Sequence, residues 1–166
     1  MLTMNSVEIK PFSAEHQTSV EKLVLPIQQI EFGVKTTLED QPDLMDIAGT
    51  FQNGDGNFWI ALDGDELVGT VGVVDISNHQ VALKKMFVSS SYRGKDKGVA
   101  QSLIDTAVEW CRTKGILQIF LGSTPRMYAA HRFYEKNGFV EVSTEQLPPL
   151  FPIALVDTKF YRRDIS

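Results

Sequence analysis

The feature that most constrains the fold is the passage from a strand-like apolar run into an amphipathic helix. Residues 81–88 are mostly apolar and have the length of a strand. Residues 98–113 carry apolar side chains at helical spacing, which predicts a helix with one buried face. That face would hold Val99, Leu103, Ile104, Ala107, Val108 and Cys111. The segment therefore predicts a helix that packs on a sheet.

The turn between this strand and this helix has the chemistry of an anion site. The first amides of a helix have no partner within the helix and point outward along a positive dipole, so a diphosphate can accept hydrogen bonds from them. Gly98 and Ala100 are small enough to let a phosphate approach the backbone. Arg93, Lys95 and Lys97 add positive charge in a chain of net charge −5. An ordinary connection with a solvated basic loop explains the turn equally well. A Walker loop and a dinucleotide fingerprint are both absent.

The rest of the chain supplies hairpins first and helical crossovers later. Strands are predicted at residues 7–12, 58–62, 67–74, 81–88, 116–121, 139–142 and 154–162, and helices at 14–32, 44–51, 98–113 and 126–136. Ser13 is expected to cap the first helix, and Pro26 to kink or divide it. This order predicts an α/β (α+β) fold with one mixed, mostly antiparallel, twisted sheet of about six or seven strands and about four helices on both faces.

Composition excludes several classes of protein. The length of 166 residues suits a single domain, 1–166. No run of about 18 apolar residues is present, and the first ten residues lack an apolar signal segment, so we expect neither a membrane span nor export, and a cytoplasmic setting. One cysteine, Cys111, gives no disulfide framework or zinc cluster, and we expect no metal and an inert buried thiol. The acidic balance argues against binding nucleic acid.

Two motifs in this chain resemble those of the GNAT acetyltransferase superfamily. Residues 95–100 are similar to the pattern [QR]-x-x-G-x-[GA], with Lys95 where glutamine or arginine is usual. Residues 130–139 match A-x-x-F-Y-E-K-x-G-F, in the right order and with a predicted strand between the motifs. The loop is longer than the commonest form, so either Arg93 or Lys95 could take the leading role. The resemblance covers nearly the whole chain and implies the acyl-CoA N-acyltransferase fold.

The resemblance also implies a cofactor site. Backbone groups of Met86, Phe87 and Val88 would meet the pantetheine arm and the thioester of acetyl-CoA, as in the addition of a strand to a sheet edge. The diphosphate would be held by Arg93, Gly94, Lys95, Lys97, Gly98, Val99 and Ala100. Thr124 or Ser123 would replace an asparagine that contacts the cofactor in many relatives.

The implied reaction is direct attack of a primary amine on the thioester within a ternary complex. Tyr134 matches the family's tyrosine that lies at the cofactor's sulfur and protonates the leaving thiolate. A tyrosine that merely packs against the sheet is the competing interpretation of this residue.

The general base is not identified by the motifs. Many relatives carry a glutamate on the strand before the turn, near the position of Ala82, and no carboxylate stands there in this chain. The open alternatives are Asp75, His79, Glu31, His131 and a water chain.

The resemblance places the acceptor between the first two helices and the last loop, at residues 30–46 and 147–153. The first segment is acidic, which indicates either a solvated helix face or an anionic rim that attracts a cationic amine. We expect a small-molecule or amino-acid-like amine. A protein N-acetyltransferase, a non-catalytic acyl-CoA-binding sensor and a domain that binds no CoA stay as alternatives. A homodimer through the edge of the final strand, at Phe160 and Tyr161, is also open.

Overall fold

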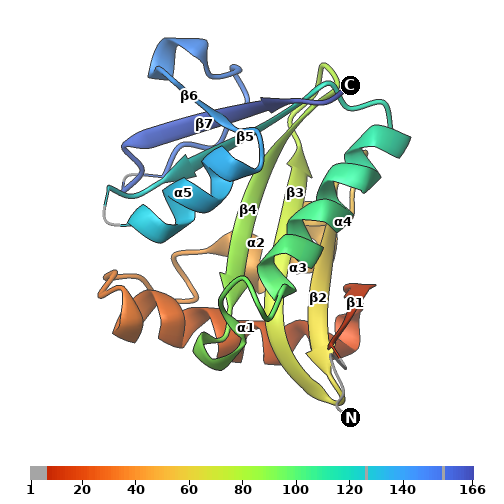
Figure 1. Cartoon of the computed structure of the whole chain (residues 1–166), viewed down its shortest axis with the longest axis vertical. Helices are drawn as coiled ribbons and strands as arrows, with labels where there is room; N and C mark the ends of the chain where they lie inside the picture. Colours follow the sequence, from red (N-terminus) through yellow and green to blue (C-terminus); the bar gives the residue numbers. More distant parts are fainter. Residues whose placement is uncertain (1–6, 126, 155) are drawn as a thin grey trace.

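The computed structural model describes residues 7–125, 127–154 and 156–166, and within them one seven-stranded mixed sheet runs through the protein (Figure 1). Its strands are β1 (Val7–Pro11), β2 (Asn57–Asp63), β3 (Glu66–Asp75), β4 (Gln80–Val88), β5 (Gln118–Ser123), β6 (Val140–Val142) and β7 (Lys159–Asp164). They lie in the order β1-β2-β3-β4-β5-β7-β6, and β4 and β5 form the parallel pair while the other neighbours are antiparallel.

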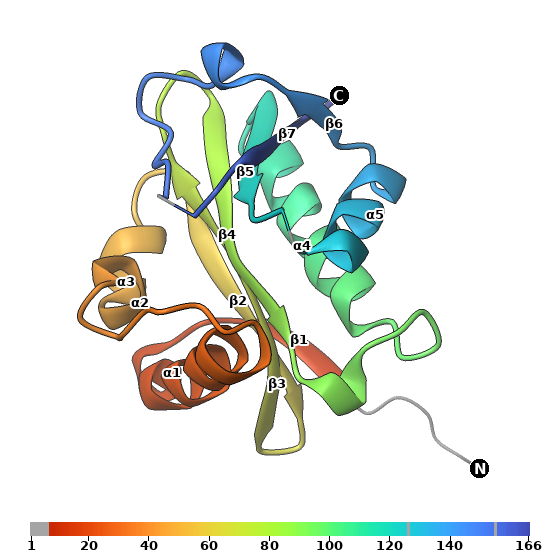
Figure 2. The same ribbon diagram turned by 90° about the vertical axis from the view of Figure 1, so that its left-hand side faces the viewer.

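Helices cover both faces of this sheet. The α-helices are α1 (Gln17–Pro26), α2 (Pro42–Met45), α3 (Ile47–Phe51), α4 (Val99–Thr113) and α5 (Tyr128–Lys136), and the short 3₁₀ or π segments are η1 (Ala14–His16), η2 (Ile27–Glu31), η3 (Ser90–Tyr92) and η4 (Thr144–Gln146). Figure 2 shows α1, α2 and α3 on one side of the strands and α4 and α5 on the other. None of the helices in the described part of the chain is long and apolar enough to cross a membrane.

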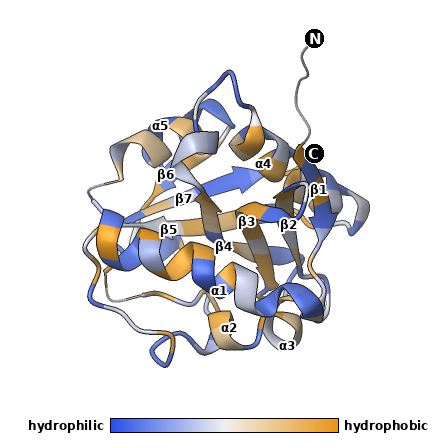
Figure 3. Ribbon diagram, turned by 90° about the horizontal axis from the view of Figure 1, so that it is seen from below, coloured by the Kyte–Doolittle hydropathy of each residue, from blue (hydrophilic) through white to orange (hydrophobic). Residues whose placement is uncertain are grey.

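Each face of the sheet has its own core. The helix α4 buries the apolar stripe predicted for it, from Val99 to Cys111, against β2–β5. The opposite core joins Val20 and Val24 of α1 to Leu44, to Phe51 and to the inner side chains of β2. In Figure 3, α1 alternates between apolar and polar segments, as expected for a helix with one buried side. The two cores hold the strands between them and fix where the ends of β4 and β5 lie.

The central strands β4 and β5 pair at one end and separate at the other. In the described part of the chain, the pairing joins residues 80–82 of β4 to residues 118–120 of β5 and stops there, and Figure 1 shows the two strands diverging beyond that point. A bulge opposite Val71 bends β4 in the same stretch, and Lys85 has a φ of 56° there. The hydroxyl of Thr70 donates a hydrogen bond of 2.7 Å to the Lys85 carbonyl and secures the bulge. The result is a wedge-shaped gap between β4 and β5.

The N-terminal helical region differs from the single helix predicted at 14–32. It begins as η1, continues as α1 and ends as the π segment η2. The predicted break at Pro26 is confirmed, because α1 ends at this residue, which has no amide hydrogen to donate. Ser13 does not cap the backbone, and its hydroxyl lies 3.1 Å from Nδ1 of His16 instead. The helix predicted at 44–51 is divided at Asp46, whose carboxylate caps α3 through the amide of Gly49.

The C-terminal segment also corrects the prediction. The last strand begins at Lys159 rather than at 154, and residues 147–154 and 156–158 lie outside the helices and strands. The strand β7 lies between β5 and β6, with Phe160 and Tyr161 buried, so it is not an edge and cannot provide the dimer contact considered above. The helix predicted from 126 is described from Tyr128 onward.

Candidate active site

The turn between β4 and α4 opens at the wide end of the gap. Gly98 is the N-cap of α4 with a φ of 70°, and a side chain there would meet nothing within 4 Å, so the space above it is open. The carbonyl of Gly94 accepts hydrogen bonds from the amides of Lys97 (3.1 Å) and Gly98 (3.3 Å). The next amides, those of residues 99–101, begin the helix and have no acceptor within it, and Ser102 is the first to donate back, to the Gly98 carbonyl at 3.0 Å. The turn therefore presents a helix N-terminus with exposed Lys95 and Lys97 around it.

Arg93 is the cation of this turn with fixed partners. Its Nε donates to the Val88 carbonyl at 2.7 Å, and its two terminal nitrogens bind both carboxylate oxygens of Glu31 at the end of η2. Hydrogen bonding from Arg93 holds the pKa of Glu31 below its usual value. The structure thus brings two predicted site residues together, as an ion pair. In this arrangement Glu31 is a poor candidate for a general base, since protonation would weaken the pair.

Three predicted cofactor contacts line the free side of β4. Met86 and Val88 direct their side chains into the core beneath α4, and Phe87 points to the core beneath α1. Among the residues that the structure describes, β4 has no strand partner on the β5 side beyond Ala82. An extended ligand could therefore pair with this backbone as an added strand would.

Tyr134 of α5 is buried beside the end of β5. Its ring packs edge-on against Phe139, with centroids 5.7 Å apart, and lies 6.2 Å from Tyr161. Burial raises the pKa of Tyr134, and the charge of Asp157 raises it further. The phenol consequently holds its proton at neutral pH, so a hydrogen-bond donor is in place where a thiolate could form nearby.

His131, on the same helix, ties α5 to the strand end. Its Nε2 lies 3.0 Å from the Thr124 carbonyl and 3.0 Å from Oγ of Ser123. A carbonyl can only accept, so Nε2 carries the hydrogen in this arrangement. His131 therefore acts as a donor here, and its Nε2 is not free to remove a proton. The carbonyl of Thr124 is used in this contact, and that of Ser123 accepts from the Thr158 amide at 3.1 Å.

A charged cluster lies on the other face of the gap, beneath α2. Because of the bulge, Lys84 and Lys85 both turn to this face, and their ammonium nitrogens lie 2.9 and 3.3 Å from Oδ2 of Asp43. Lys85 also donates to the Gln41 side chain at 2.7 Å. Burial raises the pKa of Asp43, but the two ammonium charges outweigh it and leave the value below 3.8. The Asp157 side chain is half-buried in the loop before β7, and the positive charges of both lysines act on its carboxylate.

With this geometry in view, sequence comparison decides the family. Residues 23–139 match the model of the acetyltransferase (GNAT) family. The chain belongs to the GNAT family. The predicted fold is confirmed by a GNAT acetyltransferase from Staphylococcus aureus Mu50, which is 34% identical and superposes with a TM-score of 0.92 over 96% of this chain and 99% of that one.

Curated GNAT relatives are similar over part of their length. The chain is 33% identical over 104 residues to the mouse probable N-acetyltransferase family 8 member 5, covering 60% of this chain and 45% of that protein. It is 32% identical over 124 residues to the N-acetylaspartate synthetase of Xenopus tropicalis, covering 72% of this chain and 45% of that protein. The chain thus spans less than half the length of these two relatives.

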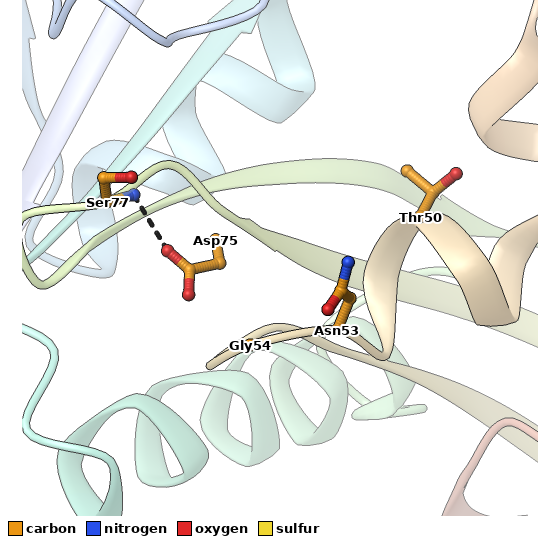
Figure 4. A pocket seen from close by; sticks show the side chains of 5 residues that line it. All are labelled: Thr50, Asn53, Gly54, Asp75 and Ser77. Atoms are coloured by element: carbon orange, nitrogen blue, oxygen red, sulfur yellow. Dashed lines mark hydrogen bonds between the residues drawn. The ribbon is translucent and has the colours of Figure 1, made fainter.

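Two of the base candidates lie far along β4 from the GNAT turn. Asp75 pairs with Val81 at the closed end of the gap, and its carboxylate accepts from the amides of Asp55 (2.9 Å) and Ser77 (2.8 Å). His79 lies in the same hairpin turn, where its carbonyl accepts from the Leu117 amide. Figure 4 shows Asp75 in a polar pocket with Thr50, Asn53, Gly54 and Ser77. These contacts make Asp75 an anchor of two turns.

The acidic N-terminal stretch does not form a free anionic rim. Glu31 is paired with Arg93, and Asp43 with the two lysines. Asp40 accepts from the Thr37 amide and Asp46 from the Gly49 amide, so both carboxylates stabilise local turns. Of the five acidic residues in the stretch, Glu39 is exposed to solvent with no contact of this kind among the described residues.

Asp157 is the site residue that sequence reasoning missed. The prediction placed it inside a strand at 154–162, where a side chain of a paired strand would not be expected to reach the gap. One signal could have found it, since it is the single carboxylate between Glu145 and Asp164. It follows residues 147–153, the segment that the GNAT resemblance assigns to the acceptor side.

Proposed function

We propose that this chain transfers an acetyl group from acetyl-CoA to a primary amine of a small-molecule or amino-acid-like acceptor. The observation that carries the proposal is the gap between β4 and β5, with a helix N-terminus after β4 and, in the core on the α4 side, a Tyr134 that the charge of Asp157 reaches. A pantetheine arm needs an extended slot, and a diphosphate needs free amides and positive charge at the end of that slot. Membership of the GNAT family supports this use of the gap.

The residues of the turn would divide the work of holding the cofactor. The amides at the start of α4, from Val99 to Ala100, bind phosphate oxygens, and Lys95 and Lys97 add charge from exposed positions. Arg93 can join them only by leaving Glu31. Backbone groups of residues 86–88 position the pantetheine, and Thr124, the residue after β5, contacts the cofactor. Bound acetyl-CoA supplies an activated acyl thioester, and the chain contributes its orientation and the protons.

Tyr134 would give its phenolic proton to the departing sulfur. We expect Tyr134→Phe to lower kcat by about 10²-fold or more, because a general acid contributes on that order, while the Kd for acetyl-CoA changes little. The measurements are acetyl transfer to an amine panel and calorimetry with acetyl-CoA. Binding without turnover on any amine, unaffected by Tyr134→Phe, would instead favour an acyl-CoA-binding sensor.

The acceptor is proposed to be small. One relative is named an N-acetylaspartate synthetase, after an N-acetylated amino acid, which supports an acceptor of this class. The cluster of Lys84, Lys85 and Asp43 gives the acceptor side of the gap a mixed charge that suits a zwitterion better than a long basic peptide. Kinetics with free amino acids, polyamines and peptides test this. Transfer only to a protein N-terminus or to a lysine side chain would contradict it.

A further inference from the structure

The loop before β7 holds a carboxylate, that of Asp157, close to the end of β5. Two backbone hydrogen bonds hold this loop, from the Asp157 amide to the Ala154 carbonyl (3.0 Å) and from the Thr158 amide to the Ser123 carbonyl (3.1 Å). They place the Asp157 side chain over the end of β5 rather than in solvent.

The Asp157 carboxylate lies directly against the backbone of Gly122. A Cβ built on Gly122 would stand 2.5 Å from Oδ2 and 3.0 Å from Cγ of Asp157, so any side chain at this position would displace the carboxylate. Gly122 follows Phe120 on the same face of β5, and Phe120 belongs to the small core on the side away from α4 and α5. The carboxylate is therefore on the face of the gap that carries the lysine cluster.

The charged groups around Asp157 come from three elements. Lys84 and Lys85 of β4 attract its negative charge, and Tyr134 of α5 is affected by that charge in turn. Asp43 of α2 offsets part of the lysine charge, because it pairs with both. No side-chain hydrogen bond or ion pair of the Asp157 carboxylate is found among the described residues. The Asp157 carboxylate therefore interacts electrostatically with the two lysines and with the tyrosine, and it has capacity to accept a proton.

The opposing effects of burial and of neighbouring groups on the pKa of Asp157 suit proton transfer. Burial raises the pKa of Asp157, against the opposing effects of a backbone hydrogen bond at Ala154 and of Lys84 and Lys85. A carboxylate whose pKa moves toward the working pH is a better base, and a half-buried one can still pass its proton to water. Among the candidate bases in the described part of the chain, Asp157 combines this position with a carboxylate that is not paired to another side chain.

We propose that Asp157 removes a proton from the ammonium group of the acceptor, a role that rests on the acetyl transfer proposed above. The ammonium group enters with three protons, and one goes to Asp157 and then to solvent. The nitrogen lone pair forms the C–N bond, the C–S bond breaks, and the sulfur takes the phenolic proton of Tyr134. The second proton of the acceptor nitrogen passes to the Tyr134 phenolate, and the third stays on the amide nitrogen of the product.

The test compares Asp157→Asn with Glu145→Gln. Both changes replace a carboxylate by its amide and remove one negative charge, but Glu145 is exposed in η4 and has no part in the gap. We expect kcat/KM of Asp157→Asn to fall by about 10²-fold at neutral pH, as for loss of a general base, while Glu145→Gln equals the wild type. The difference in kcat/KM between Asp157→Asn and the wild type should become smaller as the pH approaches the pKa of the acceptor amine, because deprotonated amine is then present in solution. The Kd for acetyl-CoA should stay within about twofold in both variants.

A second variant moves the base without removing it. Gly122→Ala pushes the carboxylate off β5, and a misplacement of about 1 Å costs on the order of 10²-fold in rate. If the wild type acetylates amines and Asp157→Asn keeps its rate and its pH profile, Asp157 is not the base and the proposed function stands. A loss that is equal at every pH and accompanied by weaker acetyl-CoA binding would also overturn the role. Absence of turnover by the wild type on every amine would overturn the function itself and the base with it.

Discussion

The bulge in β4 is secured by one buried hydroxyl, that of Thr70, and removing this hydroxyl tests whether the bulge positions Lys84 and Lys85. Thr70 on β3 is completely buried, and its Oγ donates to the Lys85 carbonyl at 2.7 Å. Thr70→Val has the same shape but no donor, so this carbonyl loses a partner in a place that water does not reach. Leaving a buried acceptor unsatisfied costs about 1–3 kcal/mol. For a chain of this size, about 2 kcal/mol corresponds to a fall in Tm of about 4–8 °C.

The control is Thr70→Ser, which keeps the hydroxyl and loses a methyl group at a cost of about 1 kcal/mol. Scanning calorimetry and urea unfolding give the order of stability, with Thr70→Val below Thr70→Ser. Because the bulge turns Lys84 and Lys85 to the same face, kcat for amine acetylation should also fall more in Thr70→Val, measured well below its Tm. A Thr70→Val protein as stable and as active as Thr70→Ser would refute the idea that this hydrogen bond secures the bulge.

Three other contacts lead to measurable outcomes. Glu31→Gln should free the Arg93 guanidinium for the diphosphate and so tighten acetyl-CoA binding. The gain should be at most about fivefold, because the half-exposed ion pair contributes no more than about 1 kcal/mol. Unchanged or weaker acetyl-CoA binding in calorimetry would contradict this. Burial raises the pKa of Cys111 to about 12, so the native protein should resist a thiol reagent at about pH 8 and react with it on unfolding. Fast labelling of the native protein would contradict this, because it would show that the thiol is accessible. The pKa of Asp43 is depressed in the folded state, so the stability that its ionised form contributes is present above pH 3.8 and is lost as the pH falls through the lower folded pKa. In urea unfolding, Asp43→Asn should therefore be less stable than the wild type at neutral pH, by a difference that shrinks as the pH falls below 3.8. A difference in stability that stays constant with pH would refute the ion pairing.

The parts of the fold that follow from local pattern were predictable. The stripe of α4 is a matter of helical spacing, and Gly98 marks its start because a residue with φ of 70° favours glycine. The break at Pro26 likewise follows from a missing amide hydrogen. These signals depend on neighbours in sequence, so one chain is enough to interpret them.

The parts that depend on distant contacts were not predictable. Strict alternation along β4 would send Lys84 and Lys85 to opposite faces, and both face α2 only because Thr70 and Asp43 stabilise a bulge. The pairing of Glu31 with Arg93 joins residues 62 positions apart, and nothing in either local sequence indicates it. Long-range ion pairs and bulges of this kind decide which charges reach the gap, and so they decide the site.

The alanine where many GNAT relatives carry a glutamate has a structural reason. Ala82 is buried in a small core with Phe120 and Phe160, and a carboxylate there would lie among aromatic rings without a partner. Ala82 pairs with Phe120 at the last register before the strands separate. One step further along the same face, β4 presents Lys84 and β5 presents Gly122, against which the carboxylate of Asp157 lies. A base supplied by the loop at this register would face the gap where it opens, with lysine charge beside it, whereas a base on the strand at Ala82 would stand where the gap is still closed.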